Sequence, residues 1–143
     1  MKQLDIVKNH LKENLFTLVV YKENKFHTSN KRGVLPLVEL LESNINFSSA
    51  SAADKVVGKA TSFLYVLLGV KEVYADVISK PALKVLQENK IYVEYSFLVD
   101  NIINRKKDGI CPFEEAVLNC IEPKEAYKNI INKLDELNIR KQN

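Results

Sequence analysis

Hydrophobic positions along this chain follow two periods, one typical of amphipathic helices and one typical of short strands. Residues 2–14 carry apolar side chains three or four positions apart, which predicts a helix. The run LFTLVVY at 15–21 is rich in β-branched and aromatic residues, and the turn KENK joins it to a second run at 25–29. These two runs predict a β-hairpin. The same patterns predict helices over 34–43, within 48–69, over 80–89, 111–120 and 123–137, strands over 72–77 and 90–95, and a short helix or loop over 96–104.

Between residues 72 and 95, a strand, a helix of about ten residues and a second strand follow one another, which is typical of the crossover unit of a parallel sheet. The chain has 143 residues, no internal repeat and no linker of unusual composition, so a single domain over 1–143 is expected. We therefore predict a three-layer α-β-α sandwich of the α/β class. Its mixed sheet begins with the hairpin and continues with parallel strands.

The segment SSASAADKVVGKATSFLYVLLG is interpreted as the central helix, because its second half is apolar almost all the way round and such a helix is normally buried. Ser51 and Asp54 match a capping box with Asp in place of Glu, so Asp54 is either a cap or a functional carboxylate. On this interpretation Lys55 and Lys59 lie one turn apart, either as an ordinary exposed pair or beside a bound carboxylate or phosphate. Gly58 then marks the close approach of a ligand or of another backbone.

The string CPFE begins the helix predicted over 111–120, with Cys111 as its N-cap, a proline in the first helical position and Glu114 in the first turn. A thiol at a helix N-terminus tends toward the thiolate, so Cys111 is a candidate nucleophile. A packed or pocket-lining thiol is the alternative. Arg32 and Arg105 lie in basic turns and, together with Glu114, form a second rank of candidate site residues.

Charge and composition narrow the class of protein. The net charge is +3 and the lysines are spread along the chain, whereas strong nucleic-acid binders usually cluster their basic residues, so nucleic acid is not an expected partner. The longest apolar run, 63–70, is too short to span a bilayer, and the charged N-terminus does not read as a signal peptide. We therefore expect a cytoplasmic protein without membrane contact. The two cysteines lack CxxC spacing, which disfavours a disulfide framework and a zinc ribbon, and no cofactor is expected.

The segments FTLVVYKENK, RGVLPLVELLE, SAADKVVGKA, VKEVYADVISKPALKVLQENKI and DGICPFEEAV resemble an uncharacterised prokaryotic family, a domain of unknown function with a cytidine deaminase-like fold. The resemblance implies this fold and a pocket at the start of the central helix. Zinc-dependent deaminases hold their metal with a His or Cys at that helix start and with two cysteines of a PCxxC pattern on the next helix. In this chain the start of the predicted central helix has the sequence Ala53-Asp54-Lys55, with neither His nor Cys. The start of the next helix keeps the proline, Pro81, but has neither cysteine. No metal site is therefore expected, and the comparison argues against zinc-dependent deamination.

Three hypotheses for function follow from these features. In the first, the protein binds a small anionic or nucleotide-like ligand at the N-terminal end of the central helix, between Asp54, Lys55, Gly58, Lys59 and Cys111. In the second, it is a metal-independent enzyme in which Cys111 is the nucleophile and Asp54 or Lys59 is the acid or base. In the third, it is an interaction protein that self-associates into a homo-oligomer through apolar faces.

Overall fold

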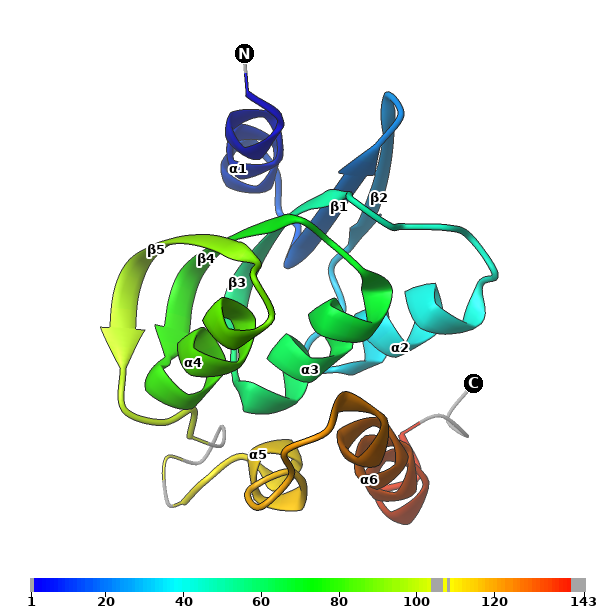
Figure 1. The fold of residues 1–143 in the computed structure, drawn as a ribbon, viewed down its shortest axis with the longest axis vertical. Helices are drawn as coiled ribbons and strands as arrows, with labels where there is room; N and C mark the ends of the chain where they lie inside the picture. Colours follow the sequence, from blue (N-terminus) through cyan, green and yellow to red (C-terminus); the bar gives the residue numbers. More distant parts are fainter. Residues whose placement is uncertain (1, 104–106, 108, 140–143) are drawn as a thin grey trace.

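The computed structural model describes residues 2–103, 107 and 109–139, in which six helices flank a five-stranded sheet (Figure 1). The helices are α1 (Gln3–Glu13), α2 (Leu35–Glu42), α3 (Lys59–Leu68), α4 (Lys80–Glu88), α5 (Pro112–Ala116) and α6 (Pro123–Glu136). The strands are β1 (Leu18–Lys22), β2 (Lys25–Ser29), β3 (Ser51–Val57), β4 (Glu72–Ser79) and β5 (Tyr92–Val99). No helix in the part of the chain that the structure describes is long and apolar enough to cross a membrane.

The strands lie in the order β2-β1-β3-β4-β5. Strand β1 is antiparallel to both β2 and β3, whereas β3, β4 and β5 run parallel. The hairpin between β1 and β2 turns through Glu23 and Asn24, which both have positive φ, as the tight hairpin turn that matches strand twist requires. The predicted hairpin and mixed sheet are therefore confirmed, and α4 makes the predicted crossover between β4 and β5.

The helices cover both faces of the sheet, so the predicted three layers are present (Figure 1). Helix α1 covers one face, where Leu4, Val7 and Leu11 pack in one cluster with Ala53 and Tyr74 of the sheet. Helices α2, α3 and α4 cover the other face, and α6 packs on the outer side of α3. Helix α3 is consequently buried on nearly all sides, as its apolar sequence indicates.

The central segment departs from the prediction, because residues 51–57 form strand β3 and not the first turns of the central helix. The helix begins at Lys59, with Gly58 as an extended N-cap residue. Ser51 and Asp54 therefore form no capping box, Gly58 is not in a helix interior, and Lys55 is not one helical turn from Lys59. The interpretation of the SAADKVVGK string as a helix start is wrong by about two turns.

The reason is that β3 has a strand on each side. It pairs with β1 through Leu18↔Asp54 and with β4 through Asp54↔Ala75, so its backbone groups are bonded in both directions. Ala52 and Ala53 are fully buried on opposite faces, where small side chains let α3 and α1 approach the sheet. These partners outweigh the weak helical preference of the local sequence.

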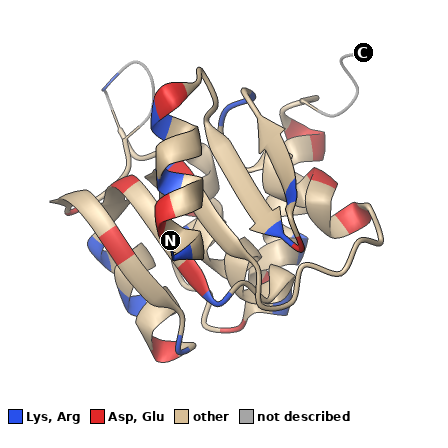
Figure 2. Ribbon diagram, turned by 90° about the horizontal axis from the view of Figure 1, so that it is seen from above, with Lys and Arg blue, Asp and Glu red and all other residues tan. Residues whose placement is uncertain are grey.

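Two further boundaries differ from expectation. Strand β5 continues to Val99, where a helix or loop was predicted, because Phe97 and Leu98 continue the ladder with β4. Helix α5 ends at Ala116 rather than at Cys120. Basic and acidic residues are interspersed along the ribbon in the view of Figure 2.

Candidate functional site

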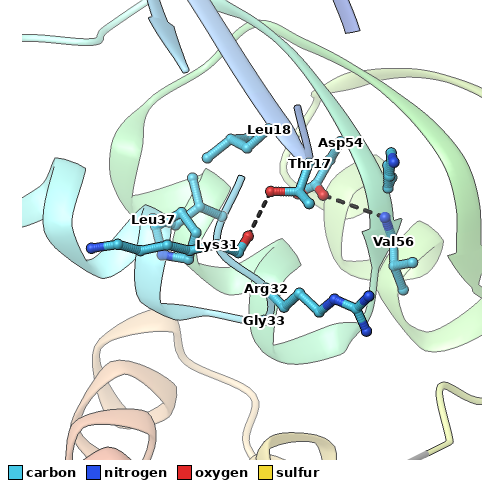
Figure 3. Close-up of a pocket in the computed structure, with 10 residues that line it drawn as sticks. Thr17, Leu18, Lys31, Arg32, Gly33, Leu37, Asp54 and Val56 are labelled. Atoms are coloured by element: carbon cyan, nitrogen blue, oxygen red, sulfur yellow. Dashed lines mark hydrogen bonds between the residues drawn. The ribbon is translucent and has the colours of Figure 1, made fainter. Parts of the chain in front are cut away.

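Two adjoining cavities lie beside the carboxyl-terminal half of β3, at the end of parallel strands where open α/β sheets commonly bind ligands. Their volumes are about 250 Å³ and about 900 Å³. Both are lined by Lys31, Arg32, Gly33 and Val56, so they meet at the loop before α2; we call the pair the β3 recess. The smaller cavity is completed by Thr17, Leu18, Pro36, Leu37, Asp54 and Lys55 (Figure 3). The larger one is completed by Val34, Leu35, Gly58, Thr61, Ile102, Ile103, Cys111, Pro112, Phe113, Glu114 and Ile139.

Asp54 is the acidic group of the smaller cavity. Its Oδ2 accepts a hydrogen bond from the Tyr65 hydroxyl at 2.7 Å, and its Oδ1 accepts one from the Val56 N–H at 3.3 Å. Dense packing around the carboxyl group raises its pKa from 3.8 to about 7, with a smaller contribution from the charge of Asp76. The hydrogen bonds from Tyr65 and the backbone oppose this rise in pKa. Asp54 therefore changes protonation near neutral pH, which suits a group that exchanges a proton or a hydrogen bond with a ligand.

The Tyr65 hydroxyl fixes the position of this carboxyl group. Tyr65 is fully buried in α3, and its contact with Asp54 ties the helix to the sheet. Burial, followed by the negative charge of Asp54, raises the pKa of Tyr65 well above 10, so the hydroxyl stays protonated and remains a donor. Sequence reasoning missed Tyr65, because it treated the residue only as part of the apolar helix.

Three basic residues surround the smaller cavity, and only some of them are committed to partners. Lys31 Nζ lies 2.9 Å from the Glu39 carboxylate, and its carbonyl accepts a hydrogen bond from the Thr17 hydroxyl. The Arg32 side chain is exposed and extends from the loop toward Val56 (Figure 3). Within the described residues no ion pair engages Arg32 or Lys55, but Lys55 lines only the smaller cavity, whereas Arg32 lines both. Arg32 is therefore the cation best placed to contact a ligand in either cavity.

Glu114 occupies the N-terminus of α3. Its two carboxylate oxygens accept hydrogen bonds from the N–H groups of Lys59 at 2.7 Å and Ala60 at 2.9 Å. A Cβ placed on Gly58 would lie 2.5 Å from Glu114 Oε1, so glycine is what allows this approach. Burial raises the pKa of Glu114, while the two N–H groups and the charge of Lys59 act in the opposite direction.

The helix N-terminus thus holds an anion, as its free N–H groups favour, but that anion belongs to the chain itself. This corrects the predicted arrangement, in which an external anion contacted the start of the central helix beside Lys55 and Lys59. Glu114 was a second-rank candidate, and Gly58 proves to accommodate this carboxylate. In the sequence, Gly58 was the residue that indicated the close approach of another group at this position.

Lys59 and Cys111 are separated from Asp54. Lys59 Nζ donates to the Leu118 carbonyl at 3.0 Å and lies over the Phe63 ring, beside a different cavity of about 680 Å³. Cys111 precedes α5 with a half-buried thiol that lines the larger cavity. Of the predicted site residues, the β3 recess therefore brings together Asp54, Lys55 and Arg32 at one end and Gly58, Cys111 and Glu114 at the other. Arg105 lies outside the described residues.

The two helix starts that bind zinc in deaminases have other roles here. At α3 the sequence is Gly58-Lys59-Ala60, and its N–H groups are bonded to Glu114. At α4 the Ser79 hydroxyl caps the helix by accepting from the Ala82 N–H at 3.2 Å. No group of three or more His, Cys, Asp or Glu side chains that could hold a metal occurs within residues 2–103, 107 and 109–139. The residues at these positions do not fit a zinc site of the deaminase kind.

Comparisons with known proteins bear on the family and the fold of the chain. The model of the family described as a domain of unknown function, DUF1893, matches residues 6–134. The crystal structure of a DUF1893 family protein, TM1506 from Thermotoga maritima, has a TM-score of 0.85 and 27% sequence identity to this chain, covering 92% of this chain and 89% of that one. The dCMP deaminase from the cyanophage S-TIM5 has a TM-score of 0.52 and 18% identity, covering 66% of this chain and 99% of that one. No curated protein matches the chain in sequence.

The two structural likenesses support different statements. The likeness to TM1506 and the family match confirm the resemblance inferred from the sequence segments. The likeness to the phage deaminase shows that the fold is cytidine deaminase-like, and it shows only the fold. The cytidine deaminase-like α/β architecture predicted from the sequence is therefore confirmed.

Proposed function

We propose a binding function for this chain, which belongs to the DUF1893 family of domains of unknown function and has the cytidine deaminase-like fold. The β3 recess binds a small anionic or nucleotide-like ligand. Arg32 contacts its negative group, and Asp54 exchanges a hydrogen bond with a polar part of the ligand.

The observation that carries this proposal is the position of Arg32 where the two cavities meet. An arginine guanidinium binds carboxylate or phosphate through two parallel hydrogen bonds, and Arg32 has no ion pair among the described residues. The neighbouring Lys31 is already paired with Glu39. Of the two basic residues at the junction, Arg32 is therefore the one without an ion pair among the described residues. A ligand anion pairs with its guanidinium group.

The lining of the recess supports a ligand with an apolar or ring-shaped part. Leu18, Leu37 and Val56 contribute apolar surface to the smaller cavity, and Phe113 contributes to the larger one. The larger cavity, about 900 Å³, falls within the range of roughly 300–1,000 Å³ that is typical for small-molecule sites. Asp54 and Thr17 add hydrogen-bonding groups beside this apolar surface. A flat ring carrying a phosphate or carboxylate combines these features.

The proposal is tested by thermal shift with a panel of nucleoside phosphates and small carboxylates. We expect at least one compound to raise the melting temperature of the native protein, and Arg32→Ala to remove this rise. Lys31→Ala is the matched control, because the adjacent side chain points away to Glu39 and its loss leaves ligand stabilisation intact. A panel without any stabilising compound, or a rise in melting temperature that survives Arg32→Ala, contradicts the proposal.

A further inference from the structure

One hydroxyl group in the larger cavity of the β3 recess is not used by the fold. Thr61 lies in the first turn of α3 and is only 7% exposed. In the part of the chain that the structure describes, no hydrogen bond engages its side chain, whereas the adjacent Ser62 hydroxyl donates to the Lys59 carbonyl at 2.6 Å. A polar side chain that is this deeply buried without a partner is rare in a folded protein and calls for an explanation.

The Thr61 hydroxyl opens into the cavity. Every fully enclosed side-chain oxygen or nitrogen among the described residues has a hydrogen-bond partner. The Thr61 hydroxyl has no such partner, so it is not enclosed, and the space beside Thr61 is the larger cavity that this residue lines. The surface around it is mostly apolar, with contributions from Val34, Val56 and Phe113. A few polar groups in an apolar lining are what fix the orientation of a bound molecule.

The charges that line this cavity differ between its two sides. Arg32 lines it from the loop before α2. Glu114 lines it at the start of α3, where its carboxylate accepts hydrogen bonds from the N–H groups of Lys59 and Ala60. These bonds leave about two further acceptor positions on the carboxylate. A ligand anion is therefore attracted to Arg32 and repelled by Glu114, whereas a hydrogen-bond donor is favoured beside Thr61.

We infer that the larger cavity recognises an uncharged amino or amide group at the end of the ligand remote from its negative charge, and that the Thr61 hydroxyl accepts the hydrogen bond of this group. The inference rests on the proposed function of the β3 recess and narrows its class of ligand. The ligand is a ring with a carboxylate or phosphate at one end, paired with Arg32, and an N–H group at the other. An ammonium group is disfavoured there, because the apolar lining makes an ion costly to desolvate.

Two pairs of compounds test this class of ligand, because the members of each pair differ only at the amino group. The pairs are para-aminobenzoate with para-methylbenzoate, and adenosine monophosphate with purine riboside monophosphate. Within at least one pair, titration calorimetry is expected to show roughly tenfold tighter binding of the amino compound to the native chain, as one hydrogen bond to a buried group contributes. Thr61→Val removes this preference, whereas Thr61→Ser keeps the hydroxyl and retains it.

Ser62→Ala is the matched control. Its hydroxyl is bonded to the Lys59 carbonyl and does not line the larger cavity, so the preference for the amino compound is expected to stay intact. The melting temperature of the ligand-free protein gives an independent measurement. Because valine has the shape of threonine and the Thr61 hydroxyl has no partner in the described fold, Thr61→Val is expected to melt no more than about 4 °C below the native chain.

The inference is overturned by equal affinities within both pairs, or by a preference that survives Thr61→Val or disappears equally in Thr61→Ser. It is also overturned if ligand-free Thr61→Val melts more than about 4 °C below the native chain, because the hydroxyl then stabilises the fold itself. If another compound of the thermal-shift panel binds through Arg32 while neither pair shows a preference, the proposed function stands and only this inference fails. If no compound binds, both fail.

Discussion

The protonation of Asp54 predicts how the stability of this protein changes with pH. The pKa of Asp54 is 3.8 in its ordinary state and about 7 in the folded chain, so folded protein holds a proton there that unfolded protein has lost. The contribution of Asp54 to stability is therefore greatest below about pH 4, decreases as pH rises toward about 7, and is level above that. A difference of about three pH units corresponds to a loss of about 4 kcal/mol, an upper figure because Asp54 is only partly buried and water in the cavity screens its charge.

The assay is urea unfolding of the native chain and of Asp54→Asn at several values between about pH 4.5 and about pH 8, a range that spans the titration. The variant keeps the shape of the side chain and removes its titration. The difference in unfolding free energy between the two proteins is expected to change by about 1.4 kcal/mol per pH unit within the window, always in the direction that makes the native chain relatively weaker at higher pH.

Taking the difference removes the contributions of other carboxyl groups, including Glu114, whose pKa is also raised by burial. Tyr65→Phe gives a second measurement. The Tyr65 hydroxyl lowers the pKa of Asp54 in the native chain. Removing this hydroxyl is therefore expected to raise the pKa of Asp54 and to move the upper end of the window to higher pH. The reasoning is refuted if native chain and Asp54→Asn show the same pH dependence.

Two further predictions concern the larger cavity. Gly58→Ala places a Cβ 2.5 Å from the Glu114 carboxylate and is expected to cost about 1–3 kcal/mol in thermal unfolding. In Glu114→Ala the same glycine substitution is expected to cost much less; equal costs in both backgrounds contradict the proposed contact. Alkylation with iodoacetamide followed by mass spectrometry is expected to modify Cys111 before Cys120, because Cys120 is buried and burial raises its pKa. Faster modification of Cys120 contradicts this assignment.

Elements that depend on their own sequence were predicted well. Helices α1, α4 and α6 lie within about one residue at each end of the predicted ranges, because their apolar spacing and prolines act locally. The hairpin was also predicted, since the β-rich run and its turn are contiguous. The resemblance of the segments to a deaminase-like family led to the correct fold.

Strand β3 and the second half of β5 could not be predicted in this way. The sequence SAADKVVG contains small and charged residues with a capping pattern, and it becomes a strand because β1 and β4 bond it on both sides. Residues 96–99 become a strand because β4 continues beside them. In both cases the deciding hydrogen bonds come from segments distant in the chain, which local propensity does not include.

The same distinction applies to the candidate site. From the sequence we predicted a buried apolar helix at the centre of the domain with an anion at its N-terminal end, but we placed the start of that helix about two turns too early. The tertiary structure decided that this anion is Glu114, which is 55 residues from Lys59 along the chain. It also decided that Lys59 turns away to Leu118, while Asp54 and Arg32 meet in one recess. A helix end attracts negative charge wherever it lies, but only the packing of α5 against α3 selects which group supplies it.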